Sequence, residues 1–250
     1  MVDSHTHLDS CKQPNAELVA TAAACGVTKI VTIGMGAAGS RRAIAAAEEF
    51  PQVYAALAIH PNDAAGFKRS DLDEIRELAR HERVVAIGET GLDYYRDHAD
   101  PVDQRRSFAA HIELARELDK PVMIHTREAD DDTLAMLDEQ AGAMKVILHC
   151  FSMGARVDEC LAHPDWWLSF AGNVTYPRNA ELRDAALRTP VERLLVETDA
   201  PYLSPQSLRG KPNRPDNVVL TAEALAVERR VSYFDFDQGV EAAAAAVFGW

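Results

Sequence analysis

Long apolar runs are missing from this 250-residue chain, although 47% of its residues are hydrophobic. A membrane-spanning helix needs about 18 or more consecutive apolar residues, so we expect none. The opening residues, Met1–His5, have neither the charged start nor the apolar stretch of a secretory signal. We therefore expect a cytoplasmic protein that has a sizeable core and does not bind a membrane.

Cysteine and positive charge are also scarce. The four cysteines are spaced neither as a zinc knuckle nor as a redox pair, and they are too few for a disulfide framework in a chain of this length. A net charge of −13 argues against broad, charge-driven coating of nucleic acid. An enzyme that takes a nucleic-acid end into a metal-lined pocket stays open, because bound divalent cations reverse the local field.

Short apolar runs rich in β-forming residues alternate along the chain with segments of helical periodicity. Eight strands are predicted, at Met1–His7, Lys29–Ile33, Val53–Ile59, Val84–Gly88, Pro121–His125, Lys145–His149, Trp166–Phe170 and Arg193–Glu197. Helices are predicted between them and in a tail, at Asn15–Cys25, Ser40–Phe50, Asp71–His81, Pro101–Leu118, Asp130–Ala141, Ala155–His163, Asn179–Arg188, Val218–Arg230 and Phe236–Phe248.

The arrangement of these segments favours one fold class. Apolar runs that are continuous rather than alternating, with crossover helices between them, indicate a parallel sheet. Eight such units in about 250 residues match a single-domain α/β protein, a closed (β/α)8 TIM barrel over residues 1–250. An open doubly wound sheet is the alternative, weakened because no Gly-x-Gly-x-x-Gly turn follows the first strand.

Side chains that are able to bind metal stand where the predicted strands end. They are His5, His7, His60, Glu89, His125, His149 and Asp199. Barrel enzymes gather their catalytic groups at this edge of the sheet. The repeated position of these residues therefore predicts a divalent-metal site at the mouth of the barrel.

Four of the histidines form two pairs. His5 and His7 are two residues apart, so on a strand both imidazoles point to one face and can hold one cation. His125 and His149 end two adjacent strands at the same register. Each of the four alone has an ordinary explanation, as a surface or a hydrogen-bonded core histidine. Imidazole, carboxylate and water ligands suit Zn²⁺, Mn²⁺ or Mg²⁺ without choosing among them.

Acidic residues complete the predicted site. Glu89 follows an apolar strand between the two histidine pairs, and its two oxygens can bridge cations about 3.5–4 Å apart. Glu197 and Asp199 share a strand face. Asp199, nearer the mouth, is predicted to bind metal and to act as the general base, while Glu197 accepts a hydrogen bond deeper in the barrel. Asp3 and Asp9 are expected to accept the ring N–H groups of the first histidine pair.

Five motifs follow one another along nearly the whole chain. They are DSHTHLD at 3–9, GETGLD at 88–93, PVMIHTREA at 121–129, HCFS at 149–152 and ETDAP at 197–201. In content and order they resemble the TatD-type metal-dependent deoxyribonucleases of the amidohydrolase superfamily. The resemblance implies a (β/α)8 barrel with a one- or two-metal centre. It places one ion on His5, His7, Glu89 and Asp199, and the other on Glu89, His125 and His149.

The same resemblance implies an activity. Family members are linked to 3′-to-5′ trimming of DNA, and some to other esters, including D-aminoacyl-tRNA. A metal-activated water would attack, with Asp199 taking its proton and Glu89 bridging the ions. His60 and Arg127 are predicted to bind the phosphate or oxyanion, although a structural role for His60 stays open. DNA is thus the expected substrate, and no obligate protein partner is expected. A barrel that uses metal for stability alone is disfavoured, because structural metal sites tend to be closed.

Two stretches depart from the family's pattern. The loop after the last strand reads Asn213-Arg214-Pro215 where the family has Asn-Glu-Pro, so a base replaces an acid at the rim. The last helix is alanine-rich at Ala242–Ala246, where the family has an asparagine before its closing Leu-Phe. The first difference bears on substrate contacts or on a local salt bridge, and the second on how the tail packs.

The remaining histidines and several tyrosines are assigned by position only. Four histidines are expected to be solvent-exposed on helices or loops: His81, His98, His111 and His163. Three tyrosines are expected in the mouth loops, where they can stack on a base or a sugar: Tyr94, Tyr95 and Tyr202.

Overall fold

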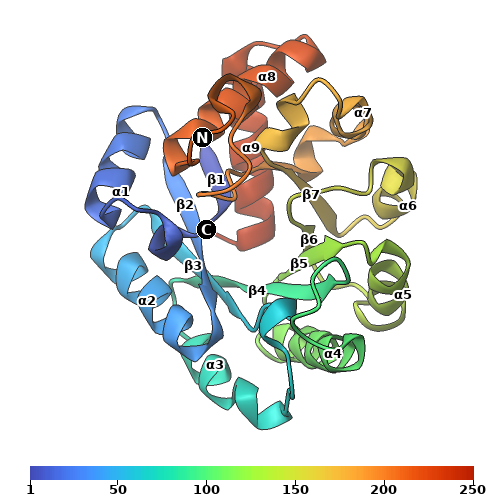
Figure 1. Cartoon of the computed structure of the whole chain (residues 1–250). Helices are drawn as coiled ribbons and strands as arrows, with labels where there is room; N and C mark the ends of the chain where they lie inside the picture. The colour runs from blue at the N-terminus through green and yellow to red at the C-terminus, as the bar shows by residue number, and fades with distance from the viewer.

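Eight strands and nine α-helices make up the chain in the computed structural model, which describes residues 1–250. The strands are β1 Val2–Thr6, β2 Lys29–Met35, β3 Val53–Ala58, β4 Val84–Asp93, β5 Val122–Arg127, β6 Val146–Leu148, β7 Trp166–Phe170 and β8 Leu194–Val196. The helices are α1 Asn15–Ala24, α2 Gly36–Glu49, α3 Asp73–Leu78, α4 Pro101–Glu117, α5 Asp130–Gln140, α6 Val157–Leu161, α7 Ala180–Arg188, α8 Val218–Arg229 and α9 Tyr233–Phe248. Every predicted strand and helix is present, and Figure 1 shows the helices surrounding the strands in chain order.

The strands form one closed parallel barrel. Each strand pairs with its neighbour in the order β1 to β8, always in parallel. The ring closes where β1 meets the segment after β8: Thr6 bridges Ala200, and the Asp199 N–H donates to the His5 carbonyl at 3.0 Å. The predicted (β/α)8 barrel is confirmed, and the open doubly wound sheet is excluded.

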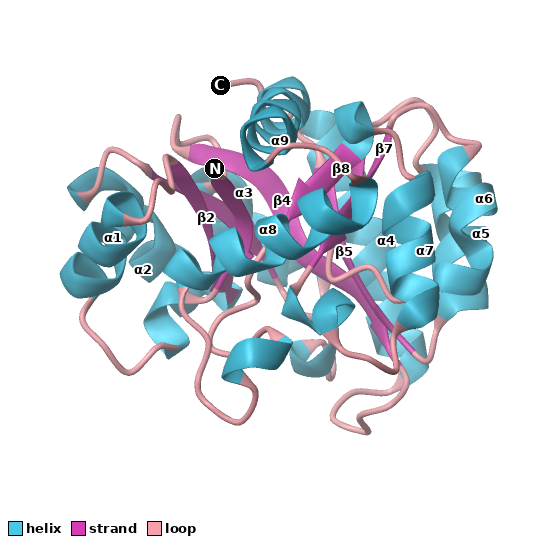
Figure 2. Cartoon of the chain, turned by 90° about the horizontal axis from the view of Figure 1, so that it is seen from above, coloured by secondary structure: helices cyan, strands magenta, loops and turns pink.

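Apolar side chains pack in two layers. The larger layer, which includes Phe108, lies between the barrel and its surrounding helices. The second fills the barrel interior, with Met123 and Trp167, and continues into Ala243 and Ala244 of α9. Figure 2 shows α9 across one end of the strands, while connecting loops gather at the other end. The small side chains of the alanine-rich tail therefore let α9 pack closely against the base of the barrel. No helix has the length and apolar character needed to span a bilayer.

β4 continues to Asp93 rather than ending at Gly88 as predicted. The backbones of β4 and β5 come close together there, since a Cβ on Gly91 would lie 2.0 Å from the His125 carbonyl oxygen. The pairing with β5 also shifts register just after Gly88, which leaves Glu89 outside the ladder of paired residues. One rigid strand thus carries both Glu89 and Asp93 toward the mouth.

The prediction of an exposed His111 is wrong, because its side chain is fully buried in α4. Its Nε2 accepts a hydrogen bond from the Ile59 N–H at 3.0 Å, and its Nδ1 donates to the Ser107 carbonyl at 2.8 Å. The backbone N–H that follows β3 needs an acceptor, and the sequence alone does not show that α4 supplies one. Of the other three histidines, His98 is exposed and two are partly exposed.

Replacing His111 with glutamine is expected to flatten the pH dependence of stability. Burial lowers the pKa of His111 from 6.5 to about 4 in the folded protein. Between these values the unfolded chain binds the proton and the folded chain does not. The contribution of neutral His111 to the free energy of unfolding is therefore present above pH 6.5. It decreases by about 3 kcal/mol as the pH falls toward 4. Urea unfolding of both proteins from pH 7 to 4 measures the difference, and equal pH slopes would contradict it.

Candidate metal centre

Residues from β1 and from the turn after β8 form a first cluster at the mouth, namely His5, His7 and Asp199. The His7 Nε2 lies 3.3 Å from the His5 Nε2 and 3.3 Å from the Asp199 Oδ1. The two histidines meet because they are two positions apart at the end of β1, with His7 one residue beyond the strand. Asp199 adopts a left-handed backbone conformation, φ 51°, which aspartate tolerates better than most residues. The Oε2 of Glu89 comes within 2.8 Å of the His5 Nε2 and joins this cluster to β4.

A second cluster lies on the opposite side of Glu89 and consists of His60, Glu89 and His125, which follow or belong to β3, β4 and β5. The Glu89 Oε1 is 2.9 Å from the His60 Nε2 and 3.3 Å from the His125 Nδ1. The Nε2 of His149 lies 3.5 Å from the His125 Nδ1 and 3.7 Å from the Glu89 Oε2. The His149 ring also stacks on His5, with centroids 3.9 Å apart. Glu89 therefore faces both clusters, one oxygen toward each.

The two clusters suit divalent cations. Glu89 is 4% exposed, yet its Oε2 has no hydrogen-bond partner, and neither has the buried Nδ1 of His7. Buried polar atoms without a partner are rare and call for a bound group. Within each cluster the ligand atoms lie within 4.8 Å of one another, close enough to surround one ion. Neutral imidazole and carboxylate are the ligands that Zn²⁺ and Mn²⁺ accept.

The electrostatics of the site also favour bound cations. Burial favours the neutral form of Glu89, but the charges of His149 and His5 outweigh it and hold the pKa of this carboxyl well below its usual range. Burial lowers the pKa of His7, yet its hydrogen bond to Asp199 and the charge of Glu89 raise it to about 9. The clustered carboxylates thus stabilise positive charge in the mouth, whether a proton or a metal ion.

Two further acids orient the histidines of the site. The Glu197 Oε1 accepts from the His149 Nδ1 at 3.2 Å and from the Cys150 N–H at 2.8 Å, which turns the His149 Nε2 toward Glu89. Glu197 is fully buried, deeper than Asp199, as its strand position predicts. The Asp93 Oδ2 lies 3.3 Å from the His125 Nε2 and turns the His125 Nδ1 inward in the same way.

The sequence assigned no role to Asp93, although this residue ends the GETGLD motif at 88–93. Its Oδ2 also accepts from the Asn62 side chain at 3.2 Å, and its Oδ1 accepts from the N–H groups of Tyr95 and Arg96. The carboxylate therefore connects the loops that follow β3 and β4 to His125 on β5. An acid only four positions after Glu89 on an apolar segment was the signal that could have identified it.

The expected role of Asp3 and Asp9 as partners of the first histidine pair is wrong. The buried Asp3 carboxylate accepts from the Thr198 N–H at 2.8 Å and from its hydroxyl at 2.7 Å, and Asp9 pairs with Arg42 at 3.0 Å. Asp3 points across to β8 because the turn into Asp199 leaves the polar groups of Thr198 without a strand partner. It thus supports the turn that presents Asp199.

The loop after β8 is anchored despite its altered motif. The Asn213 side chain donates to the Thr198 carbonyl at 2.8 Å. Arg214 forms a local salt bridge with Asp216, 3.0 Å from Nε to Oδ1. The base that replaces the family's acid therefore has a partner within its own loop.

The mouth encloses a cavity of about 700 Å³. His60 and Arg127, the predicted phosphate-binding residues, both line it, as do Glu89 and Asp199. His60 is drawn into the second cluster by Glu89, whereas the Arg127 guanidinium lies over the Tyr95 ring, 3.7 Å from its centroid. The predicted substrate-binding groups thus share one space with all the predicted ligands except the fully buried His5.

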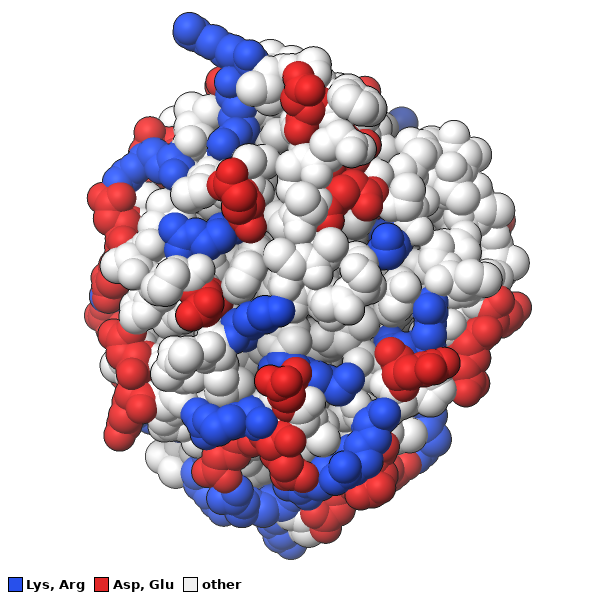
Figure 3. Space-filling view, turned by 180° about the vertical axis from the view of Figure 1, so that it is seen from behind, with Lys and Arg blue, Asp and Glu red and all other residues white.

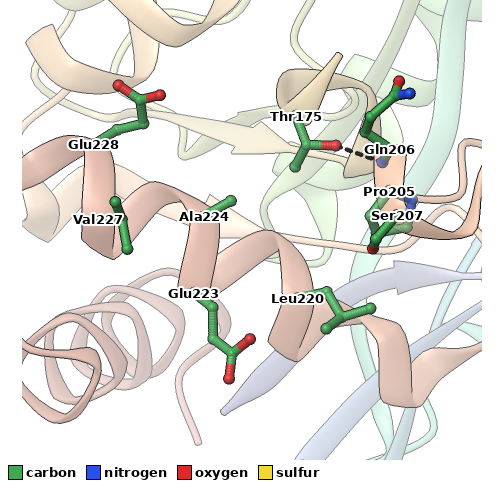
Figure 4. Close-up of a pocket in the computed structure, with 9 residues that line it drawn as sticks. All are labelled: Thr175, Pro205, Gln206, Ser207, Leu220, Glu223, Ala224, Val227 and Glu228. Atoms are coloured by element: carbon green, nitrogen blue, oxygen red, sulfur yellow. Dashed lines mark hydrogen bonds between the residues drawn. The ribbon is translucent and has the colours of Figure 1, made fainter. Parts of the chain in front are cut away.

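A second hollow, of about 440 Å³, lies outside the barrel against α8 (Figure 4). Its charged lining groups, Glu223 and Glu228, point in different directions, and no histidine or cysteine lines it. The hydrogen bond from the Gln206 N–H to the Thr175 hydroxyl, 2.7 Å, closes one side. It has no constellation for catalysis, and the mouth is the candidate active site.

Comparison with known proteins points the same way. Residues 2–249 match the family described as TatD related DNase. The chain is 45% identical over 241 residues to the uncharacterized metal-dependent hydrolase TatD of Mycobacterium tuberculosis, covering 92% of this chain and 91% of the relative. It is 34% identical over 203 residues to the 3′-5′ ssDNA/RNA exonuclease TatD of Salmonella typhimurium, covering 80% and 78% of the two chains.

A solved structure supports the fold independently. The TatD homologue YjjV of Escherichia coli K12 superposes with a TM-score of 0.92 at 27% identity, over 100% of this chain and 98% of that one. The family match, the sequence identity and the metal-binding clusters agree. The chain belongs to the TatD-related DNase family and is a metal-dependent hydrolase of the amidohydrolase superfamily.

Proposed function

We propose that this hydrolase is a 3′-to-5′ exonuclease that removes nucleotides from the ends of single-stranded DNA. The observation that carries the proposal is the pair of clusters that share Glu89 within one open cavity. Two cations about 3.5–4 Å apart are the usual means of stabilising both oxygens of an in-line phosphoryl displacement. The Salmonella relative with the exonuclease name supports the substrate class.

Two divalent ions, Zn²⁺, Mn²⁺ or Mg²⁺, would occupy the site. One would be held by His5, His7 and Asp199 with Glu89, and the other by Glu89, His125 and His149. Such ions polarise the phosphate and lower the pKa of a water molecule. Side chains of the protein would accept the proton and bind the phosphate in the proposed reaction.

Asp199 would accept the proton of the attacking water. Burial raises the pKa of Asp199, but its hydrogen bond with His7 and the nearby positive charges outweigh burial and lower it, so the carboxylate is ionised at neutral pH. Its side chain is 14% exposed and lines the cavity, where a water can reach it. His60 and Arg127 would donate hydrogen bonds to the phosphate oxygens from the opposite side.

One face of the molecule offers a long nucleic-acid strand no continuous basic track. On the face in Figure 3, basic and acidic side chains are interspersed, without a continuous basic track. Together with the net charge of −13, this gives a long strand little to follow across that face.

Labelled oligonucleotides test the proposed function. The protein loaded with Mn²⁺, Zn²⁺ or Mg²⁺ should shorten single-stranded DNA labelled at its 5′ end one nucleotide at a time, and a chelator should abolish this. A strand blocked at its 3′ end should resist. Release of D-amino acid from D-aminoacyl-tRNA, without shortening of DNA, would overturn the proposal in favour of another ester substrate.

A further inference from the structure

The mouth of the barrel has two unlike walls. Arg96 and Arg127 come from the ends of β4 and β5, whereas Tyr202 and Leu203 come from the turn after β8. Strands four places apart in an eight-stranded ring lie across the barrel from each other, so the two groups face one another over the cavity. We call Arg96, Arg127 and Tyr95 the arginine wall, and Tyr202, Leu203 and Met35 the apolar wall.

The arginine wall carries positive charge without a partner. Both guanidinium groups are exposed, and neither forms a hydrogen bond or a salt bridge within the chain. Elsewhere the exposed Arg105 is paired with Asp132, whereas the exposed Arg178 and Arg230 are unpaired too, so the position of these two at the mouth is what sets them apart. The Tyr95 ring under Arg127 fixes the plane of that guanidinium while its N–H groups stay free. Two unpaired arginines at one lip of an acidic protein suit a phosphate.

The apolar wall offers a flat face. Tyr202 is 58% exposed, a high value for a tyrosine, and its ring lies 6.1 Å from that of His7. Leu203 and Met35 also line the cavity. The first cluster, with His7 and Asp199, adjoins this wall, while the second cluster adjoins the arginine wall. A phosphate held between the clusters would therefore have an aromatic surface on one side and two cations of the protein on the other.

We propose that this mouth recognises a single-stranded nucleic-acid end across three subsites, an inference that rests on the proposed nuclease function. The terminal base stacks on Tyr202, the scissile phosphate lies between the two clusters within reach of Arg127, and the next phosphate along the strand binds Arg96. The preferred substrate therefore has an unpaired terminal base and at least two successive phosphodiesters. Neither requirement applies to a small phosphodiester.

Substrates of increasing length separate the subsites. The protein is assayed with bis(p-nitrophenyl) phosphate, a dinucleotide with one phosphodiester and a trinucleotide with two. We expect the trinucleotide to be cleaved with a higher kcat/KM than the dinucleotide. Arg96→Met should lower kcat/KM for the trinucleotide by about 10- to 100-fold and leave bis(p-nitrophenyl) phosphate unchanged. Tyr202→Ala should cost roughly 10-fold on both nucleotides, while Tyr202→Phe, which keeps the ring, should restore it.

Arg80→Met is the matched control. Arg80 follows α3, away from the cavity, and pairs only with the exposed Glu77 and Glu117. The substitution therefore removes the same charge without changing the mouth. Binding of a fluorescein-labelled oligonucleotide to the Asp199→Asn protein, by anisotropy, gives a readout that needs no turnover. Arg96→Met should weaken this binding, and Arg80→Met should not.

The outcomes divide cleanly. Equal loss with Arg96→Met and Arg80→Met would overturn the three-subsite inference. Equal effects of Arg96→Met on all three substrates, or no preference for the trinucleotide, would also overturn it. If the unaltered protein cleaves bis(p-nitrophenyl) phosphate but one of these results is found, phosphodiester hydrolysis is supported and the three subsites are rejected. If it cleaves no phosphodiester, the proposed function fails, and the anisotropy comparison still decides whether the two walls bind nucleic acid.

Discussion

Glu89→Gln should lower kcat by roughly 10³-fold, because several kcal/mol of charge stabilisation in the transition state depend on this side chain. Each carboxylate oxygen faces one cluster, with Oε2 at 2.8 Å from the His5 Nε2 and Oε1 at 2.9 Å from the His60 Nε2. An amide has one oxygen and one N–H2 group, so it can serve at most one cluster. Bound metal, measured by mass spectrometry after dialysis, should fall together with nuclease activity.

Glu113→Gln provides the control for Glu89→Gln. Glu113 lies on the exposed side of α4 and pairs with Arg69, so the same change there removes one charge without reaching the mouth. Its metal content and its kcat should match those of the unaltered protein. A Glu89→Gln protein that keeps its full metal complement and rate would show that the clusters do not depend on a shared carboxylate.

Asp199→Asn should reduce kcat by about 10²- to 10⁴-fold with a much smaller change in KM, because the variant loses the proton acceptor while the walls of the cavity remain. The second cluster does not include Asp199, so metal bound there should persist. The asparagine can keep the left-handed backbone at this turn. Steady-state kinetics on single-stranded DNA, with metal analysis of the same samples, measures both effects.

Asp9→Asn is the matched control for Asp199→Asn. Asp9 flanks the first histidine pair in sequence but pairs with Arg42 outside the cluster. Removing its charge tests whether a nearby negative charge alone accounts for the loss. A comparable fall in kcat for the two variants would contradict a specific role for Asp199 as base.

The barrel and the place of the site could be predicted because both depend on strand periodicity. Apolar runs locate the strands, and residues that end parallel strands must meet at one edge, so His5, Glu89 and Asp199 could be brought together without coordinates. The end of β4 could not be located, because its continuation depends on close backbone contact with β5 at Gly91. Sequence periodicity carries no information about that approach.

The partners of individual polar groups could not be predicted. Asp3 bonds to Thr198 on the other side of the ring closure, and His111 accepts the N–H that follows β3. Asp93 connects the loops after β3 and β4 to His125 on β5 through its two oxygens. The partner of each side chain depends on which polar groups the fold leaves without another partner. That is a property of the assembled barrel and not of any one segment.

The closure between β1 and β8 also determines when the site can exist during synthesis. The Asp3 and Thr198 that meet there are 195 positions apart, and His5 accepts the N–H of Asp199 across the same junction. A growing polypeptide that has not yet reached Asp199 has an open ring and lacks both the proposed base and one carboxylate of the first cluster. We expect such an incomplete polypeptide on the ribosome to have no hydrolase activity. Activity would appear only after synthesis has passed Asp199 and the ring has closed.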